Sequence, residues 1–235
     1  MNTRPILAQL SSKGLIFLTL IFLLCLTDCK KEDKAPVNQN IIKDADGNVY
    51  TSVQIGTQVW LVENLKTTKF RNSDPIPNIT ETLAWGAATT SAYCNLSNDE
   101  VNANLFGRLY NWYAVNDNRN IAPPGWHIPS DAEWATLESF LGGGTVAGGK
   151  LKESGSAHWC NQNVGGTNES GFKALPGGTR TDKLFVTGCQ WGTFWSSTEF
   201  DADNSYNRIL FDTGTEINRV DNNKKFGMSV RCIKD

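Results

Sequence analysis

One stretch of the chain gathers side chains that could exchange protons or bind a metal ion. Residues 126–134 read Trp-His-Ile-Pro-Ser-Asp-Ala-Glu-Trp, which places one of the two histidines close to two carboxylates. Such a histidine is a common acid–base group or metal ligand. However, Ser130 and Glu133 have the spacing of a helix capping box, in which each side chain accepts a hydrogen bond from a backbone amide. We therefore expect His127 and Glu133 to support the scaffold, and the sequence predicts no catalytic residue and no metal ligand.

Two glycine-containing segments resemble ligand-binding loops only in part. Residues 144–150 are close to a phosphate-binding loop, but Leu151 replaces the serine or threonine that holds Mg²⁺. We expect a flexible connector there. Residues 44–48 begin like a calcium-binding EF-hand loop, but Gly47 stands at the fourth position instead of the sixth, and Ile55 replaces the final glutamate. We expect a turn there.

Aromatic and acidic residues in loop-like surroundings supply the candidate binding groups. Trp85, Trp159 and Trp191 would stack on sugar rings or aromatic side chains if exposed, and would otherwise cover the core. Asp201 and Asp203 lie in a polar loop that could hold a structural calcium ion, although a surface turn also accounts for them. We expect no other cofactor.

Two helices are predicted to position these groups. One covers residues 130–141, starts at the capping box and is ended by Gly142. The residues of its expected buried face are Trp134, Leu137 and Leu141. The other covers residues 102–116, where apolar residues also recur at helical spacing, although Gly107 weakens it by about 1 kcal/mol relative to alanine.

Short strands complete the predicted fold. Asp46-Gly47 is a strong two-residue turn signal, so residues 41–62 are expected to form a hairpin. Residues 70–100 lack periodicity and predict a long surface excursion. Apolar runs between polar loops predict further strands at 172–175, 194–195, 206–211 and 228–233. Two helices with short antiparallel strands and long loops predict an α+β domain.

The amino-terminal residues resemble an export signal and not part of a fold. The apolar run over residues 15–26 has the length of a secretory signal core and is too short to span a bilayer. It closes on Leu-Thr-Asp-Cys, which is similar to a lipobox, although Asp28 replaces the usual small residue. An ordinary secreted protein or an uncleaved anchor is the alternative. The predicted divisions are a signal peptide over 1–28, lipidation at Cys29, a flexible tether over 29–43 and a domain over 44–235.

Charge and the expected lipid anchor restrict the partners. The chain contains 22 lysine and arginine residues and 24 aspartate and glutamate residues, so it has no large basic field that would attract nucleic acid. We therefore expect no nucleic-acid partner. The charged run after Cys29, Lys-Lys-Glu-Asp, resembles the surface-export signal of Bacteroidetes lipoproteins. We therefore expect a lipid-anchored protein at the outer membrane or cell surface.

Several ordered sequence blocks resemble the Fibrobacter succinogenes major paralogous domain family. They include Gly-Arg-Leu-Tyr-Asn-Trp-Tyr at 107–113, Gly-Trp-His-Ile-Pro-Ser-Asp-Ala-Glu-Trp at 125–134, Phe-Trp-Ser-Ser-Thr-Glu at 194–199 and Gly-Met-Ser-Val-Arg-Cys at 227–232. The resemblance covers about residues 44–235 and implies an exported lipoprotein. The family is distantly similar to the formylglycine-generating enzymes, which implies a C-type-lectin-like fold. The catalytic cysteine pair of those enzymes has no counterpart in residues 205–226, so no enzyme activity is expected.

The predicted domain contains four of the six cysteines, namely Cys94, Cys160, Cys189 and Cys232. An exported protein can form disulfides between them. Four cysteines allow three pairings. The family resemblance implies that Cys94 pairs with Cys232, which leaves Cys160 to pair with Cys189.

The sequence therefore predicts a non-catalytic binding module for a polysaccharide, a peptide or an envelope protein. The expected binding face is the loop-rich region between Gly142 and Lys225, because rigid scaffolds commonly carry recognition on their loops. A structural envelope component without a small ligand is the alternative, and a formylglycine-generating type of activity is a remote one.

Overall fold

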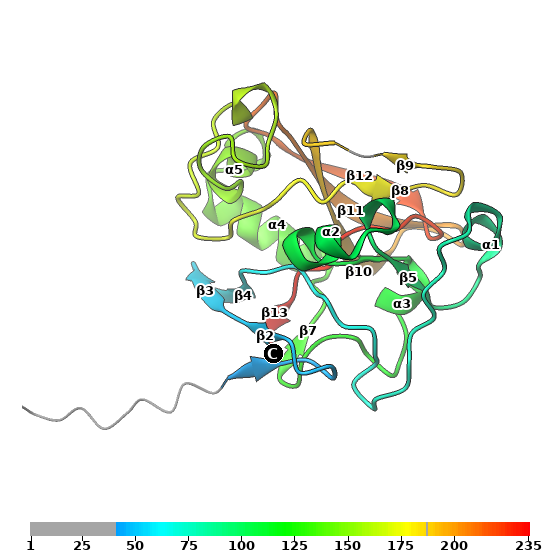
Figure 1. Cartoon of the computed structure of the whole chain (residues 1–235). Coiled ribbons are helices and arrows are strands. Elements are labelled where there is room, and N and C mark those ends of the chain that lie inside the picture. Colours follow the sequence, from blue (N-terminus) through cyan, green and yellow to red (C-terminus); the bar gives the residue numbers. More distant parts are fainter. Residues whose placement is uncertain (1–40, 187) are drawn as a thin grey trace, which may run out of the picture. The chain divides into compact units, whose positions relative to one another are not determined.

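The computed structural model describes residues 41–186 and 188–235, which combine helices with several small antiparallel sheets (Figure 1). The predicted signal peptide, Cys29 and the tether up to residue 40 lie outside the described residues. Ile42 and Lys43, which belong both to the expected tether (29–43) and to the expected hairpin (41–62), form the first strand. Within the described part of the chain, no helix has the length and apolarity needed to cross a membrane.

The helices are α1 (Thr82–Ala87), α2 (Glu100–Phe106), α3 (Trp112–Val115), α4 (Asp131–Phe140) and α5 (Gly144–Leu151). The strands are β1 (Ile42–Lys43), β2 (Val49–Tyr50), β3 (Ser52–Ile55), β4 (Gln58–Leu61), β5 (Tyr93–Cys94), β6 (Leu109–Tyr110), β7 (Trp126–His127), β8 (Thr179–Arg180), β9 (Phe185–Val186), β10 (Trp191–Glu199), β11 (Asn204–Phe211), β12 (Ile217–Asn223) and β13 (Ile233–Lys234). The predicted α+β class is confirmed.

The largest sheets are a four-stranded one, ordered β3-β4-β13-β7, and a three-stranded one, ordered β10-β11-β12. Strand β13 lies between β4 and β7, where Ile233 pairs with both Trp60 and His127 (Figure 1). Just before β13, Met228 exchanges backbone hydrogen bonds of 3.0 and 3.1 Å with Tyr110. The carboxyl-terminal segment therefore joins strands that are far apart in the sequence.

The helix predicted over 130–141 is confirmed as α4. The Ser130 side chain accepts from the Glu133 amide at 3.3 Å, and the Glu133 carboxylate accepts from the Ser130 amide at 2.8 Å. Trp134 and Leu137 are fully buried, as the amphipathic pattern indicates. Gly142 follows with a φ of 102°, a left-handed conformation that favours glycine after a helix.

The helix predicted over 102–116 is wrong. Helix α2 ends at Phe106, and Gly107, with a φ of 79°, directs the chain into β6 before α3 begins. A Cβ atom at residue 107 would lie 2.7 Å from the Asn64 Cβ and 2.8 Å from the Leu65 carbonyl oxygen. The neighbouring segment therefore requires glycine at this position, and the helical periodicity belongs to two short helices.

The flexible connector expected over 144–150 is also wrong, because these residues form most of α5. Its glycines allow neighbouring backbone to approach closely. A Cβ atom at Gly149 would lie 2.6 Å from the Gly165 carbonyl oxygen, and one at Gly148 would clash with the Glu216 carbonyl. Tertiary contacts thus maintain a helix whose glycine content gives it a low intrinsic propensity.

The predicted hairpin is confirmed and connects β1 to β2, but its turn is not the two-residue one expected at Asp46-Gly47: the Gly47 amide donates to the Asp44 carbonyl at 3.0 Å, which centres the turn on residues 45 and 46. Asp44 Oδ1 stabilises it by accepting from the Asp46 and Asn48 amides, each at 3.0 Å. A second hairpin, β3–β4, follows directly. In the carboxyl-terminal half, β10 and β11 are longer than the strands expected there, and β12 forms where no strand was predicted, whereas residues 172–175 make a single bridge.

Buried cations fasten loops to the core. Arg231 is 1% exposed, and its Nη1 donates to the carbonyl oxygens of Leu61 at 3.0 Å and Phe172 at 2.7 Å. Its Nε donates to Asn64 Oδ1 at 3.0 Å. Burial lowers the pKa of Arg231 to about 9, so the guanidinium remains charged at neutral pH. Four further cationic side chains are buried in the described part of the chain: Lys152, Arg180, Arg208 and Lys224.

Candidate functional site

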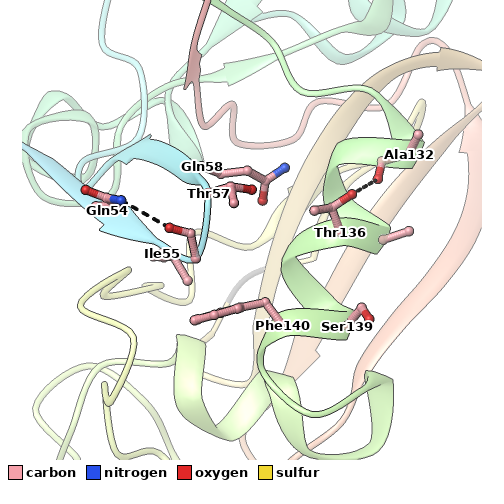
Figure 2. A pocket seen from close by; sticks show the side chains of 10 residues that line it. Gln54, Ile55, Thr57, Gln58, Ala132, Thr136, Ser139 and Phe140 are labelled. Carbon is pink, nitrogen blue, oxygen red and sulfur yellow. Dashed lines mark hydrogen bonds between the residues drawn. The ribbon is translucent and has the colours of Figure 1, made fainter.

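An open groove of about 980 Å³ lies between the β3–β4 hairpin and helix α4 (Figure 2). Figure 2 shows the hairpin and the helix facing each other, with side chains from both projecting into the space between them. The hairpin contributes Gln54, Ile55, Gly56, Thr57 and Gln58, and the helix contributes Ala132, Ala135, Thr136, Ser139 and Phe140. The lining residues carry no charged side chain.

Helix α4 can form one wall of the groove because it has a buried face and an exposed face. Its buried face carries Trp134 and Leu137, and its groove residues lie on the opposite face at spacings of three and four. Trp134 anchors the helix, since its ring centroid lies 4.9 Å from that of Trp60 on β4. The same pair of tryptophans therefore sets the separation of the two walls.

A two-residue turn, Gly56-Thr57, forms the end of the hairpin wall. Gly56 has a φ of 61°, and a Cβ atom there would lie 2.8 Å from the Phe140 ring. Phe140 reaches across from α4 to this turn, yet 63% of its surface stays exposed (Figure 2). The glycine thus lets an exposed aromatic ring lie directly against the hairpin.

Some polar groups of the groove are already engaged. Gln58 Nε2 donates to the Glu133 carbonyl at 3.0 Å, and Thr136 Oγ1 donates to the Ala132 carbonyl at 3.0 Å. The hydroxyl groups of Thr57 and Ser139 make no side-chain hydrogen bond to any described residue. The groove therefore presents neutral hydrogen-bonding groups around an exposed ring.

The histidine of the 126–134 stretch supports the scaffold beside this groove. His127 Nε2 lies 2.8 Å from Glu133 Oε1, and Nδ1 lies 2.8 Å from Asp235 Oδ1. Partial burial opposes the charged ring, but the hydrogen bonds to Asp235 and Glu133 outweigh it and raise the pKa of His127. His158, the other histidine, contacts the Glu153 carboxylate at 2.7 Å.

The tryptophans proposed as binding groups do not form an exposed surface. Trp159 is 2% exposed and its Nε1 donates to the Ala174 carbonyl at 3.0 Å, so its predicted role as a stacking platform is wrong. Trp85 is fully buried on α1. Trp191 is partly buried, with its ring centroid 5.5 Å from that of Phe211. These rings mainly cover the core.

Asp201 and Asp203 lie in the turn between β10 and β11. Asp201 Oδ1 accepts from the Asp203 amide at 2.9 Å and from the Asn204 amide at 2.8 Å, which makes it a turn-stabilising residue. Hydrogen bonds from Asn204 and the backbone lower the pKa of Asp201. In the described residues, no group of three or more His, Cys, Asp or Glu side chains is arranged to hold a metal ion.

One of the two implied disulfides is confirmed and the other is corrected. Cys160 and Cys189 form a disulfide. Cys94 and Cys232 are buried free thiols, and they lie in different hydrophobic clusters, so the implied pair is wrong for the described residues. Burial raises the pKa of Cys94 to about 11, which keeps this thiol protonated and unreactive.

The groove was missed by the sequence interpretation, which placed binding in the loops after residue 142. Two signals pointed to it. The Gly56-Thr57 turn predicts a hairpin end, and Phe140 is an aromatic residue on the polar face of α4. Neither signal says that the two walls face each other.

The comparisons with known proteins cover both walls of the groove. A family model described as the Fibrobacter succinogenes major domain matches residues 53–234. No curated protein and no solved structure matches the chain.

Proposed function

We propose that this chain, which belongs to the Fibrobacter succinogenes major domain family, is a non-catalytic binding module and that the groove between β3–β4 and α4 is its binding site. The main support for this proposal is the size and lining of the groove. Its volume of about 980 Å³ lies in the range of ligand sites, and Phe140 offers exposed apolar surface among neutral polar groups.

The chemistry of the lining residues supports binding without catalysis. Nucleophilic and acid–base catalysis need a titratable group placed at the reacting atoms. The groove residues offer only hydroxyl, amide, aliphatic and aromatic side chains. The nearest histidine, His127, has both ring nitrogens occupied by Glu133 and Asp235.

Two variants of matched chemistry test the site. Ala135 is exposed inside the groove, and Ala84 is exposed on α1 outside it. The full-length protein in mild detergent is screened on arrays of oligosaccharides and of peptides. We expect a bound probe whose affinity falls at least about tenfold in Ala135→Trp, which fills the groove, and stays unchanged in Ala84→Trp. A wild type that binds neither array, or equal binding by both variants, would contradict the proposal.

We also propose that the module is carried at the outer membrane or cell surface by a lipid on Cys29. The support is the lipobox-like ending of the apolar run at residues 26–29 and the charged residues after it. Palmitate labelling of wild type and Cys29→Ala tests the anchor. Equal labelling of the two would refute it.

The finer fold assignment, a C-type-lectin-like fold, is likewise a proposal. Its support is the combination of two helices of eight or more residues, small antiparallel sheets and long loops. An experimental structure whose chain path differs from that of C-type lectins would contradict it.

A further inference from the structure

We infer that the groove takes an uncharged carbohydrate chain, an inference that rests on the proposed function and names its ligand class. The main observation is the placement of Phe140. Its ring lies against Gly56, where any side chain would collide with it, and 63% of its surface remains open. An aromatic ring held in this way offers an apolar surface on which the CH groups of a sugar ring can pack.

Hydroxyl groups lie next to this ring. Thr136 and Ser139 are three residues apart on α4, so they lie on one face about 4.5 Å apart along the helix axis. Thr57 supplies another hydroxyl from the opposite wall. A sugar with its ring on Phe140 would therefore find hydrogen-bonding partners on both sides.

The absence of charge among the lining residues selects against charged ligands. A polyuronate or a sulfated glycan would lose hydration on entering the groove without gaining an ion pair from its walls. A neutral sugar exchanges hydrogen bonds with water for hydrogen bonds with hydroxyl and amide groups, which costs little.

A peptide is less well matched to the same walls. Peptides that bind as added strands gain affinity from unpaired main-chain groups of a sheet edge. In this groove one wall is a helix, whose backbone amides are used within α4 from Trp134 onward. The other wall includes β3, an edge strand of its sheet, so the preference for a polyol rests on the hydroxyl and amide side chains of the lining and on the exposed Phe140 ring.

The test uses the full-length protein in mild detergent, with neutral oligosaccharides, uronic-acid oligosaccharides and random heptapeptides as probes. We expect binding to neutral oligosaccharides, with affinity at least about tenfold lower in Phe140→Ala and retained in Phe140→Trp, because tryptophan keeps a stacking surface. The matched control is Phe200→Ala, since Phe200 is 49% exposed but lies outside the groove.

The outcomes separate the two proposals. Binding only to peptides or to uronic-acid probes, with loss in Ala135→Trp, overturns the carbohydrate inference and keeps the groove as a binding site. Binding to neutral sugars that Phe140→Ala leaves unchanged overturns the inference as well. No groove-dependent binding of any probe overturns both.

Discussion

Glu133 connects three parts of the molecule through separate atoms. Its Oε2 accepts from the Ser130 amide, its Oε1 contacts His127, and its backbone oxygen accepts from Gln58 in the groove wall. The capping role could be predicted from the Ser130–Glu133 spacing because a capping box is local. Two other contacts could not be predicted, because they join positions far apart in the sequence. They are the hydrogen bond from Gln58 to the Glu133 carbonyl and the contact of His127 with Asp235.

The His127–Glu133 contact predicts a pH-dependent contribution to stability. The folded pKa of His127 is raised, so its contribution is complete below the unfolded value of about 6.5 and is lost as the pH rises through the folded value. The pKa of Glu133 is lowered, because hydrogen bonds from Ser130 and His127 outweigh the opposing effect of burial. Its contribution is therefore complete above the unfolded value of about 4.3 and is lost as the pH falls through the folded value.

The difference in melting temperature between wild type and His127→Gln is therefore expected to be largest between about pH 4.5 and 6.5 and to shrink as the pH rises through the folded pKa of His127. Because His127 is partly exposed, high salt should reduce the difference. An NMR titration of His127 should give a midpoint above about 6.5. A difference that does not vary with pH would show that the contact does not depend on the charge of the ring.

At the scale of elements, local signals predicted α4 and failed for α2 and α5. Helix α4 has its cap, its buried face and its end encoded within residues 130–142. Helix α2 ends at Gly107 because Asn64 and Leu65 lie against it, and α5 forms although glycine disfavours it. The end of α2 and the formation of α5 depend on contacts with residues that are distant in the sequence, and hydrophobic periodicity carries no information about such contacts.

Two glycines with positive φ allow the requirement for glycine after α2 to be measured. Gly107 and Gly125 both have a φ of 79°, but Gly107 also has a ψ of −175°, an extended conformation that is almost confined to glycine. A Cβ atom at Gly125 has no neighbour within 4 Å, whereas one at Gly107 collides with Asn64 and Leu65.

Urea denaturation should show a loss of about 1 kcal/mol for Gly125→Ala and a loss larger by about 1–3 kcal/mol for Gly107→Ala. Equal losses would mean that neither the contact with residues 64–65 nor the extended conformation of Gly107 adds a cost beyond that of a positive φ.

At the scale of the whole molecule, the groove could not be predicted because its walls lie at residues 54–58 and 132–140. Composition and turn signals predicted the α+β class, and the family blocks predicted the family. The pairing of Cys94 with Cys232 failed because a resemblance carries no distances, and the two thiols lie in separate clusters.

The Cys160–Cys189 disulfide joins positions separated by 29 residues, so it constrains the unfolded chain over a long loop. Replacing both cysteines by serine is expected to lower the free energy of unfolding by about 2–4 kcal/mol in urea denaturation. Reductant should destabilise the wild type by a similar amount and leave the double variant unchanged. A double variant that reductant destabilises further would indicate a second disulfide.

The position of the segment from Met228 to Lys234 sets the order in which the protein can fold. This segment bonds to Tyr110, supplies β13 between β4 and β7, and carries Arg231 to the carbonyls of Leu61 and Phe172. During synthesis these residues are made after all the elements that they join, so those elements wait for the strand between β4 and β7. Contacts of such high sequence separation slow folding, and the incomplete chain stays open for longer. The domain therefore reaches its native state only after residues 228–234 have been synthesised.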